Sequence, residues 1–322
     1  MKLTVVIPIY NVEKYLGRCI NSLLNTEGIG DVEIILVDDG SYDGSTEIEN
    51  EYINRYSNIF LVKQDNAGPS AARNVGLEKA SGDYVFFCDS DDMVVPALFS
   101  RVIDTLESTD ADIVLWDAVL IDEDDSLLNS KYSNDYVHVG LSDNDGLISG
   151  RQLFDKTLSY NSNFPATVWL GAYKKKYLIE NALFFENGLI HEDELWAFKV
   201  LFNAQSIRYI KDSVYQYRVR KGSLTNPLDN DRSLSADSLV QVYSELYSFF
   251  ESQQPNDLLI KKVESVLTQR YLHMIFKYEL YRYDCRNKID KRLLWRTSGR
   301  IKDRVKVVLL WAKEIHFEVI GK

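Results

Sequence analysis

The sequence predicts an α/β protein, in which a doubly wound, mostly parallel sheet is followed by a helical C-terminal extension. Three observations carry this prediction. Short apolar runs alternate with segments of helical periodicity over residues 3–92, two of these runs end in clusters of carboxylates, and residues 258–322 are helical in pattern and basic in charge. A strand buried on both faces reads as a continuous apolar run, so the first observation is typical of a parallel sheet.

The alternating region predicts four strands, with a helix after each of the first three. The strands are expected at residues 3–9, 32–37, 59–62 and 84–88, and the first two helices at 12–24 and 45–56. Residues 64–76 are expected to form a turn that leads into a third helix, which ends near residues 81–82. In the first helix Val12, Leu16 and Ile20 recur on one face at helical spacing. Ser45 or Thr46 is the expected cap of the second. This repeat winds into a parallel sheet with right-handed connections.

The remaining pattern is less regular. It predicts helices at 97–110, 152–159, 174–180, 191–204, 232–250 and 258–284, strands at 112–119 and 167–173, and a short hairpin from 207–210 and 214–219. Residues 122–150 are polar, which indicates an edge hairpin or an excursion from the sheet.

The charge is distributed unevenly along the chain. The formal net charge is −11, but residues 258–322 hold 16 Lys and Arg against 7 Asp and Glu, whereas residues 1–257 hold 21 against 41. An acidic body does not attract phosphates by its overall field, so we expect no nucleic-acid partner. A phosphate-bearing ligand would need a metal ion or a few placed cations.

Other features of the sequence indicate where the protein works. The apolar run at residues 3–7 is cut off by Pro8 and predicts a first strand, not a signal peptide. No segment approaches the ~18 apolar residues of a spanning helix, so we expect a chain that does not cross a membrane. Cys19, Cys88 and Cys285 lie far apart without metal-ligand or redox spacing, which favours a reduced, cytosolic setting.

The stretch after the fourth strand concentrates acids. The run 84–88 leads directly into Asp89, Ser90, Asp91 and Asp92. Unpaired buried charge is very costly, so the strand has to end here and present the acids at the C-terminal edge of the sheet. Asp-x-Asp at a strand end suits a hard divalent metal with phosphate partners. From this stretch alone, an acidic surface turn remains an open alternative.

Two common motif assignments fail for the acids after the second strand. If Asp39 is position one of an EF-hand loop, position twelve is Asn50 instead of the required Glu. A dinucleotide-binding fingerprint is also missing, because no Gly-x-Gly-x-x-Gly follows the first strand.

Four motifs in order then carry a resemblance. Residues 5–11 (VVIPIYN), 37–45 (VDDGSYDGS), 66–76 (NAGPSAARNVG) and 89–92 (DSDD) resemble the inverting family 2 glycosyltransferases of the GT-A fold, which build bacterial capsules, O-antigens and cell-wall polymers. The resemblance implies a nucleotide-sugar donor, usually a UDP-sugar, and Mn²⁺ or Mg²⁺. It also implies a nucleotide-sugar-binding and catalytic domain over residues 1–228, with a basic helical region over 229–322.

The resemblance assigns the nucleoside site to the first two motifs. Pro8, Tyr10 and Asn11 match the turn that lines the nucleoside. Asp39 matches the acid that accepts a hydrogen bond from uracil, with Asp38 as its neighbour. A carboxylate at this point favours a base that presents an N–H group.

The third and fourth motifs resemble the diphosphate and metal site. Asn66 opens the third motif, and Arg73 matches the residue near the diphosphate, where a guanidinium offsets charge. Asp89 matches the ribose or metal-water contact and is also expected among the metal ligands. Asp91 matches the direct metal ligand, and Ser90 between them is expected to line the nucleotide.

Two later segments complete the expected site. Asp193 matches the family's catalytic base, with Glu192 beside it, and such a carboxylate takes the proton of the acceptor hydroxyl. Acids at a helix start are also ordinary caps, so this alternative stays open. Arg218 lies in residues 217–223, which resemble the flexible segment that closes over the diphosphate, although a basic surface turn stays an open alternative.

The resemblance therefore implies metal-dependent, inverting transfer of one sugar from a UDP-sugar to a glycan acceptor, expected to be linked to a lipid diphosphate. The Gln-x-x-Arg-Trp motif of processive synthases is absent from the sequence, which favours one sugar per encounter. A sugar nucleotidyltransferase would need a Gly-rich basic loop after the first strand. An inactive carbohydrate-binding relative would need a broken Asp-x-Asp or a missing base.

The basic C-terminal stretch 300–317 is amphipathic. Apolar residues recur on one side, namely Ile301, Val305, Val308, Leu309, Ala312 and Ile315. Such a helix either lies in an anionic membrane surface or packs its apolar side on the catalytic domain. We hypothesise peripheral binding to the inner face of the plasma membrane. The sequence leaves a homodimer open.

Overall fold

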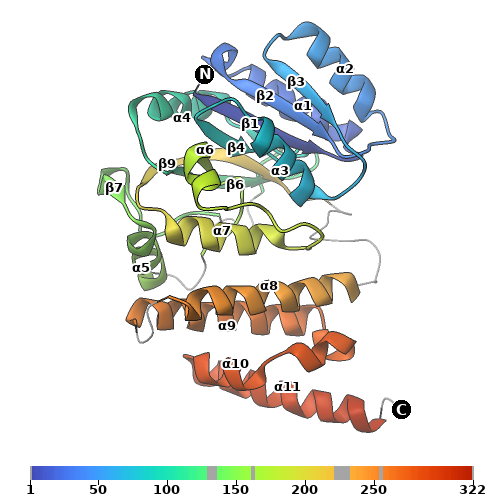
Figure 1. Cartoon of the computed structure of the whole chain (residues 1–322), viewed down its shortest axis with the longest axis vertical. Coiled ribbons are helices and arrows are strands. Elements are labelled where there is room, and N and C mark those ends of the chain that lie inside the picture. Colours follow the sequence, from blue (N-terminus) through green and yellow to red (C-terminus); the bar gives the residue numbers. More distant parts are fainter. Residues whose placement is uncertain (1, 129–135, 161–163, 221–232, 254–256, 321–322) are drawn as a thin grey trace.

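The computed structural model describes residues 2–128, 136–160, 164–220, 233–253 and 257–320. Figure 1 shows the sheet and its helices at one end of the molecule, with the C-terminal helices stacked below them. Helix α7 lies between the sheet and the pair α8–α9, and α10 and α11 lie farthest from the sheet.

The N-terminal part is the predicted alternation of strands and helices. Its elements are β1 (Leu3–Ile9), α1 (Glu13–Leu24), β2 (Glu33–Asp38), α2 (Ser45–Arg55), β3 (Ile59–Lys63), α3 (Pro69–Lys79) and β4 (Tyr84–Phe87). The strands pair in parallel in the order β3-β2-β1-β4. β1, β2 and β4 are buried almost throughout, as expected for a sheet covered on both faces. The α/β prediction is confirmed.

The sheet then continues with mixed strand directions. The next elements are β5 (Met93–Val94), α4 (Pro96–Ser108), β6 (Ile113–Ile121), β7 (Leu147–Ile148), α5 (Gly150–Tyr160), β8 (Gly171–Lys174), α6 (Lys175–Glu180), α7 (Glu192–Asn203) and β9 (Ile207–Arg218). The order extends as β4-β8-β6-β9-β5. β8 runs antiparallel to both β4 and β6, whereas β6 and β9 are parallel. β6 therefore points its C-terminal end toward the same sheet edge as β1, β2 and β4.

Two predictions about strands are wrong in detail. The expected hairpin of residues 207–219 is one continuous strand, β9, which passes straight through the polar residues 211–213. Its pairing with β6 shifts register on either side of Asp117, so an irregularity accommodates the polar stretch in place of a turn. The strand expected at 167–173 begins only at Gly171, because just four residues pair with β4 and β6. Residues 129–135 of the expected edge excursion lie outside the described residues.

The C-terminal region is helical, as predicted. It contains α8 (Ser233–Glu251), α9 (Leu258–Lys277), α10 (Lys291–Thr297) and α11 (Ile301–Ile320). The helix expected to reach residue 284 ends at Lys277, where Glu279 takes a positive φ of 54° and 3₁₀ turns follow at Leu280–Arg282 and Asp284–Lys288. None of the described helices is both long enough and apolar enough to pass through a bilayer.

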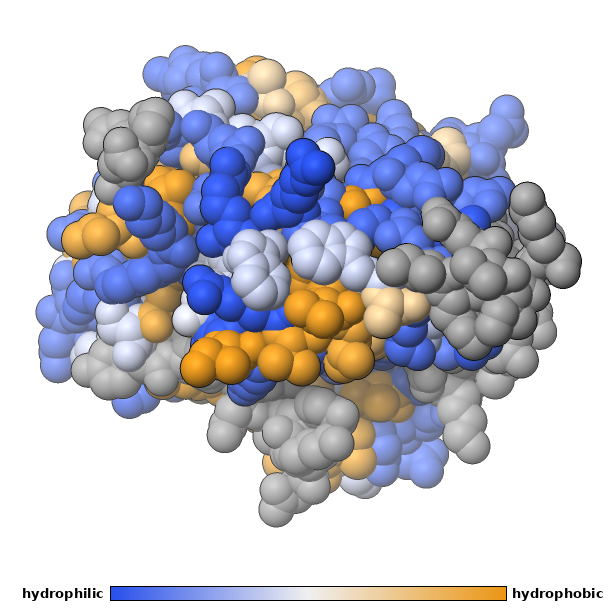
Figure 2. All heavy atoms as spheres, turned by 90° about the horizontal axis from the view of Figure 1, so that it is seen from below, coloured by the Kyte–Doolittle hydropathy of each residue, from blue (hydrophilic) through white to orange (hydrophobic). Residues whose placement is uncertain are grey.

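Helix α11 packs on α9 with an unexpected side. Asp303, Val307 and Leu310 are buried, and Asp303 is paired with Arg300. The predicted apolar side instead faces outward, with exposures of 82% at Ile301, 52% at Val305, 49% at Val308 and 50% at Leu309. Packing of that side on the catalytic domain is therefore excluded for these residues. Figure 2 shows the result as apolar side chains gathered on the lower surface of the molecule, with hydrophilic ones around them.

A close contact between α3 and β1 holds one face of the sheet. A Cβ built on Gly76 would lie 2.2 Å from Cγ1 of Val6, a separation that real atoms do not adopt. Only glycine lets α3 approach β1 this closely, and α3 in turn carries Arg73.

We expect Gly76→Ala to lower the free energy of unfolding by about 1–3 kcal/mol, because the core has no space for the methyl group. Urea denaturation followed by circular dichroism measures this. Gly30→Ala is the control, because no atom lies within 4 Å of its Cβ position. Equal stability of the two variants would contradict the close packing.

Candidate active site

The acids singled out in the sequence lie at one edge of the sheet. Asp38 ends β2 and Asp39 follows it, and Asp89 and Asp91 follow β4; these two strands flank β1. Parallel strands end at the same edge, and ligands of open α/β sheets bind there. The first turn of α7 joins this edge through Arg73 Nη1, which donates to Glu192 Oε1 at 2.6 Å.

Asp39 fixes the turn that precedes α3. Its Oδ1 accepts hydrogen bonds from Gln64 Nε2 at 2.7 Å and the Ala67 N–H at 2.8 Å, and its Oδ2 accepts from the Gly68 N–H at 2.8 Å. Oδ2 therefore has one donor among the described residues. A carboxylate oxygen accepts more than one hydrogen bond, so Asp39 retains capacity for an N–H of a bound base.

Aromatic side chains lie beside Asp39. Tyr10 is 45% exposed, and its ring meets that of Tyr42 edge-on at 6.1 Å. Tyr42 is 83% exposed, which leaves its ring surface open to a planar ligand. Tyr42 was not predicted as a site residue, although its position within the second motif was a usable signal. Pro8 is partly exposed on β1 at the same edge.

Other predicted nucleoside residues are occupied by contacts within the loop. The Oδ1 of Asn11 accepts from the Tyr42 N–H at 3.0 Å, and the Asn11 N–H donates to Ser41 Oγ at 3.2 Å. Asp38 is buried, accepts from the Ser41 N–H at 2.8 Å and pairs with Lys63 at 3.3 Å. Asp38 and Asn11 thus stabilise the loop that carries Asp39. Asn66 lies next to Gly40, whose φ of +79° lets the two backbones approach.

Arg73 connects the two halves of the site. Its Nη2 donates to Asp89 Oδ1 at 2.9 Å, and its Nη1 holds Glu192. Arg73 is 6% exposed, and its Nε has no hydrogen-bond partner among the described residues. The structure therefore places Arg73 at the predicted site, but as the link between the carboxylates that follow β4 and those that begin α7.

The acidic loop after β4 is braced by residues at the end of β9. Asp92, 1% exposed, accepts from the Tyr215 hydroxyl at 2.7 Å and from the Arg218 N–H at 2.7 Å. Nε of Arg218 donates to the Asp91 carbonyl at 2.7 Å, and its Nη1 donates to the Asp122 carbonyl at 2.8 Å. The sequence assigned no role of its own to Asp92, although it is the third acid of the cluster. Ser90 is also buried here.

The prediction that Arg218 belongs to a flexible closing segment is wrong. Its side chain is fully buried at the end of β9, where the guanidinium pairs with Asp125 Oδ1 at 2.5 Å and also satisfies the carbonyl groups described above. Residues 221–223 of that segment lie outside the described residues. The cation that does face the acids is the next arginine, Arg220, whose Nε lies 2.5 Å from Asp91 Oδ2. Burial raises the pKa of Asp91, against the lowering effect of Arg220.

The carboxylates suit a divalent cation that brings its own further ligands. The described residues contain no group of three or more His, Cys, Asp or Glu side chains arranged to hold a metal. Mg²⁺ and Mn²⁺ sites in nucleotide enzymes commonly take one or two carboxylates and complete the shell with phosphate and water. The Arg220 guanidinium against Asp91 shows that this oxygen already accepts a cation. The carboxylates of Asp91 and Asp89 therefore fit a divalent cation such as Mg²⁺ or Mn²⁺.

The first turn of α7 carries Glu192, Asp193 and Glu194, which the positive end of the helix dipole stabilises. The preceding His191 adopts a φ of 69° and turns the chain into the helix. Burial and the neighbouring Glu192 raise the pKa of Asp193 to about 7, and Arg73 opposes this rise. A carboxylate with this pKa is suited to exchange protons near neutral pH.

Cavities in the described chain do not mark the site unambiguously. A cavity of about 60 Å³ is lined by Glu192, Trp196 and Phe184, among others, and lies beside the first turn of α7. A cavity of about 330 Å³ is lined by Lys2, Gly30 and neighbouring residues at the opposite, N-terminal end of β1. Charge and geometry, not cavity size, single out the acidic edge.

Comparisons with known proteins point to one family. The family model for glycosyl transferase family 2 matches residues 4–164. Glycosyltransferase GlyG of Streptococcus pneumoniae is 30% identical over 280 residues, which cover 86% of this chain and 87% of that protein. The uncharacterized glycosyltransferase YibD of Escherichia coli is 32% identical over 224 residues, and GlyA of S. pneumoniae is 35% identical over 228. Each of these matches covers 70% of this chain, but the chain spans only 63% of YibD and 31% of GlyA.

Solved structures show the same fold. Staphylococcus aureus TarS 1–349 in complex with UDP-GlcNAc superposes with a TM-score of 0.69 at 21% identity, covering 98% of this chain and 89% of that one. The mannosyltransferase PcManGT of Pyrobaculum calidifontis, in complex with GDP-Man and Mn²⁺, gives a TM-score of 0.56 at 16% identity, covering 98% of this chain and 87% of that one. The GT-A fold expected from the sequence is thereby confirmed.

Proposed function

The chain belongs to glycosyl transferase family 2, and on this premise we propose that it moves one sugar from a UDP-sugar to a glycan acceptor in the synthesis of a bacterial surface polysaccharide or glycoconjugate. The observation that carries the proposal is the chain of contacts from Asp89 through Arg73 to Glu192. On this proposal, these contacts join the carboxylates that would bind the metal and the diphosphate to the turn that would carry the proton acceptor. Transfer from a nucleotide sugar requires both.

The donor is proposed to bind with its base over Asp39 and its diphosphate toward Asp89 and Asp91. Asp39 has acceptor capacity for the N3–H of uracil, and the exposed ring of Tyr42 offers a stacking surface beside it. Support also comes from TarS, which was solved with UDP and with UDP-GlcNAc. PcManGT was solved with GDP-Man, so the choice of base is the first point to test.

Asp89 and Asp91 would hold Mn²⁺ or Mg²⁺, which supplies positive charge to the departing diphosphate. The protein fixes the position of these oxygens, because hydrogen bonds from Arg218 to Asp92 and to the Asp91 carbonyl hold the loop in place. Arg73 keeps Asp89 Oδ1 oriented.

Asp193 is proposed as the base. Its carboxylate takes the proton of the acceptor hydroxyl as that oxygen forms a bond to the anomeric carbon, and the bond from that carbon to UDP breaks in the same step. One such displacement inverts the anomeric centre. Arg73 holds the neighbouring Glu192 and so fixes the turn that presents Asp193.

The acceptor is proposed to be lipid-linked, with the protein bound peripherally to an anionic membrane surface. The contact surface is the α10–α11 face, defined by the exposed apolar side chains of Trp295, Ile301, Val305, Val308, Leu309 and Trp311. The two tryptophan rings stack with centroids 6.3 Å apart, and Arg304 lies over Trp295 at 5.6 Å. Tryptophan beside cations is typical of side chains at a membrane interface.

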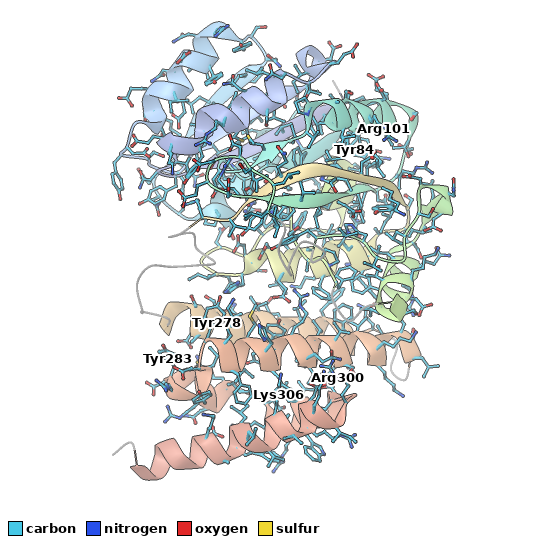
Figure 3. The ribbon with its side chains drawn as sticks, turned by 180° about the vertical axis from the view of Figure 1, so that it is seen from behind. Tyr84, Arg101, Tyr278, Tyr283, Arg300 and Lys306 are labelled. Carbon is cyan, nitrogen blue, oxygen red and sulfur yellow. The ribbon has the colours of Figure 1, made fainter. Side chains whose placement is uncertain are left out.

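The charge around the α10–α11 face favours lipid over a second copy of the chain. Helices α10 and α11 also carry exposed cations at Arg292, Lys302, Arg304 and Lys313. The two acids between residues 291 and 314 are occupied, Asp303 by Arg300 and Glu314 by Lys291. A symmetric dimer through this face would bring like charges together, whereas anionic lipid pairs with them. Figure 3 shows Arg300 and Lys306 on the side of α11 that faces α9, away from this surface.

A panel of UDP- and GDP-sugars tests the donor assignment. We expect UDP to bind in isothermal titration with Mn²⁺ present, and UDP release to be measurable with at least one UDP-sugar. Binding of GDP without binding of UDP would overturn the assignment of Asp39 to uracil.

We expect Asp193→Asn to keep nucleotide affinity and to lower the transfer rate by about 10² or more, because the amide cannot accept the proton. Steady-state kinetics and UDP titration separate the two effects. Turnover close to wild type would make Asp193 a helix cap.

Asp91→Ala should weaken the metal-dependent part of UDP binding and abolish transfer, while the fold remains intact. Titrations with and without Mn²⁺ measure the difference. Asp104→Ala, which removes an exposed acid on α4, is the control. If Asp91→Ala responds to Mn²⁺ as the wild type does, Asp91 is not a ligand.

We expect the full chain to sediment with vesicles of phosphatidylcholine and phosphatidylglycerol at low salt and to be released at high salt. Val308→Glu and the pair Lys302→Glu/Arg304→Glu should abolish sedimentation. Leu147→Glu, an exposed apolar position on β7, should not. A wild-type chain that stays in the supernatant contradicts the membrane proposal, as does a Val308→Glu variant that changes only the oligomer mass.

A further inference from the structure

The third acid of the first turn of α7 points away from the nucleotide edge and into the C-terminal helices. Oε1 of Glu194 accepts hydrogen bonds from Arg270 Nε at 2.6 Å and from the Tyr243 hydroxyl at 3.0 Å. Arg270 lies on α9 and Tyr243 on α8. Glu194 is 4% exposed, so its charge depends on these partners for compensation.

Arg270 is itself held in place. Its Nη1 donates to the Phe164 carbonyl at 2.9 Å, and its guanidinium lies 5.8 Å from the ring centre of Phe198 on α7. Tyr243 is fully buried and stacks on Tyr271 with ring centres 4.4 Å apart. Both partners of Glu194 therefore have fixed positions.

A second contact joins the same two helices at the start of α7. The ring of His191 meets the ring of Tyr278 nearly edge-on at 5.8 Å. Tyr278 follows the C-terminal end of α9, as Figure 3 shows. α9 and the residue that follows it thus contact the start of α7 on both sides of Asp193, at Glu194 through Arg270 and at His191 through Tyr278.

Asp193 lies between two acids that are each neutralised from a different direction. Arg73 on α3 pairs with Glu192, and Arg270 on α9 pairs with Glu194. The hydrogen bond described for the Asp193 side chain comes from the Glu194 N–H at 2.9 Å. The field at Asp193 is therefore set by the two arginines as well as by the two glutamates.

We propose that Arg270 is a positioning residue for the catalytic step, which by its ion pair with Glu194 holds the first turn of α7 and sets the charge around Asp193. The proposal rests on the proposed function, in which Asp193 is the base. It makes the C-terminal helices part of the catalytic apparatus, because α9 supplies a residue without which the base would stand beside an unpaired buried charge.

The test is the pH dependence of kcat in variants that replace one member of the Arg270–Glu194 ion pair by uncharged Gln. In Arg270→Gln the unpaired Glu194 adds negative charge near Asp193, so Asp193 keeps its proton to higher pH. The acidic limb of the kcat–pH profile then moves to higher pH. In Glu194→Gln the unpaired Arg270 has the opposite effect, and the limb moves down. Below the limb, each unit of displacement changes the rate about tenfold. In the double variant both charges are gone, and the limb returns toward the wild-type position.

Controls separate this role from a merely structural one. Lys262 lies on α9 like Arg270 and forms an exposed ion pair with Asp155. Lys262→Gln removes this pair and should leave the acidic limb of the kcat profile unchanged. Arg270→Lys keeps the charge and should restore most of the profile. His191→Gln identifies any contribution from the one imidazole at this turn, whose pKa burial lowers. Lys277 on α9, Arg73 and Asp89 stay constant throughout.

An acidic limb that stays fixed in all Arg270 and Glu194 variants, with loss of thermal stability only, overturns the proposal. If Arg270→Gln does not fold, the downward shift in Glu194→Gln decides alone. The Asp193→Asn variant separates a failure of the base assignment from a failure of the role proposed for Arg270. Normal turnover in Asp193→Asn refutes the assignment of the base, whereas loss of turnover combined with an unmoved limb refutes only the role of Arg270.

Discussion

The site depends on the pairing of Arg73 with both Asp89 and Glu192. Buried carboxylates are stable only when a cation or hydrogen-bond donors compensate them. Arg73 compensates two that come from different parts of the chain, one after β4 and one at the start of α7. It can do so because Gly76 lets α3 lie directly against β1. A packing detail of the sheet thus determines where these two carboxylates meet.

The same rule extends outward through other placed arginines. Arg218 and Arg220 compensate the loop 89–92, and Arg270 compensates Glu194. In a protein of net charge −11, these few cations are already paired with carboxylates before any ligand arrives. A diphosphate adds negative charge to a site whose guanidinium groups are already engaged. This is a physical reason for a divalent cation at Asp91 and Asp89, where the donor atoms fit one.

The sequence was sufficient for what local pattern determines. The alternation over residues 3–92 predicted the parallel sheet, and the acids at strand ends predicted that these side chains would lie together at one edge of it. It was not sufficient for pairings between distant residues, such as Arg73 with Glu192 or Arg270 with Glu194. β9 was misread as a hairpin because residues 211–213 are polar, and only its pairing with β6 shows that the strand continues. The predicted division at residue 228 stays a prediction.

Helix α11 shows why an amphipathic pattern does not settle which side packs. Hydrophobicity alone would bury Ile301, Val305 and Leu309, yet these are exposed and Asp303 is buried. Arg300, one turn earlier, pairs with Asp303 and makes its burial tolerable, and Val307 and Leu310 then complete the contact with α9. The remaining apolar side chains are left at the surface farthest from the sheet (Figure 1). Helix α9 contacts α11 and also pairs with α7 through Arg270 and Glu194. The helix that carries the exposed apolar face, α11, therefore packs against the same helix that holds the first turn of α7 beside Asp193.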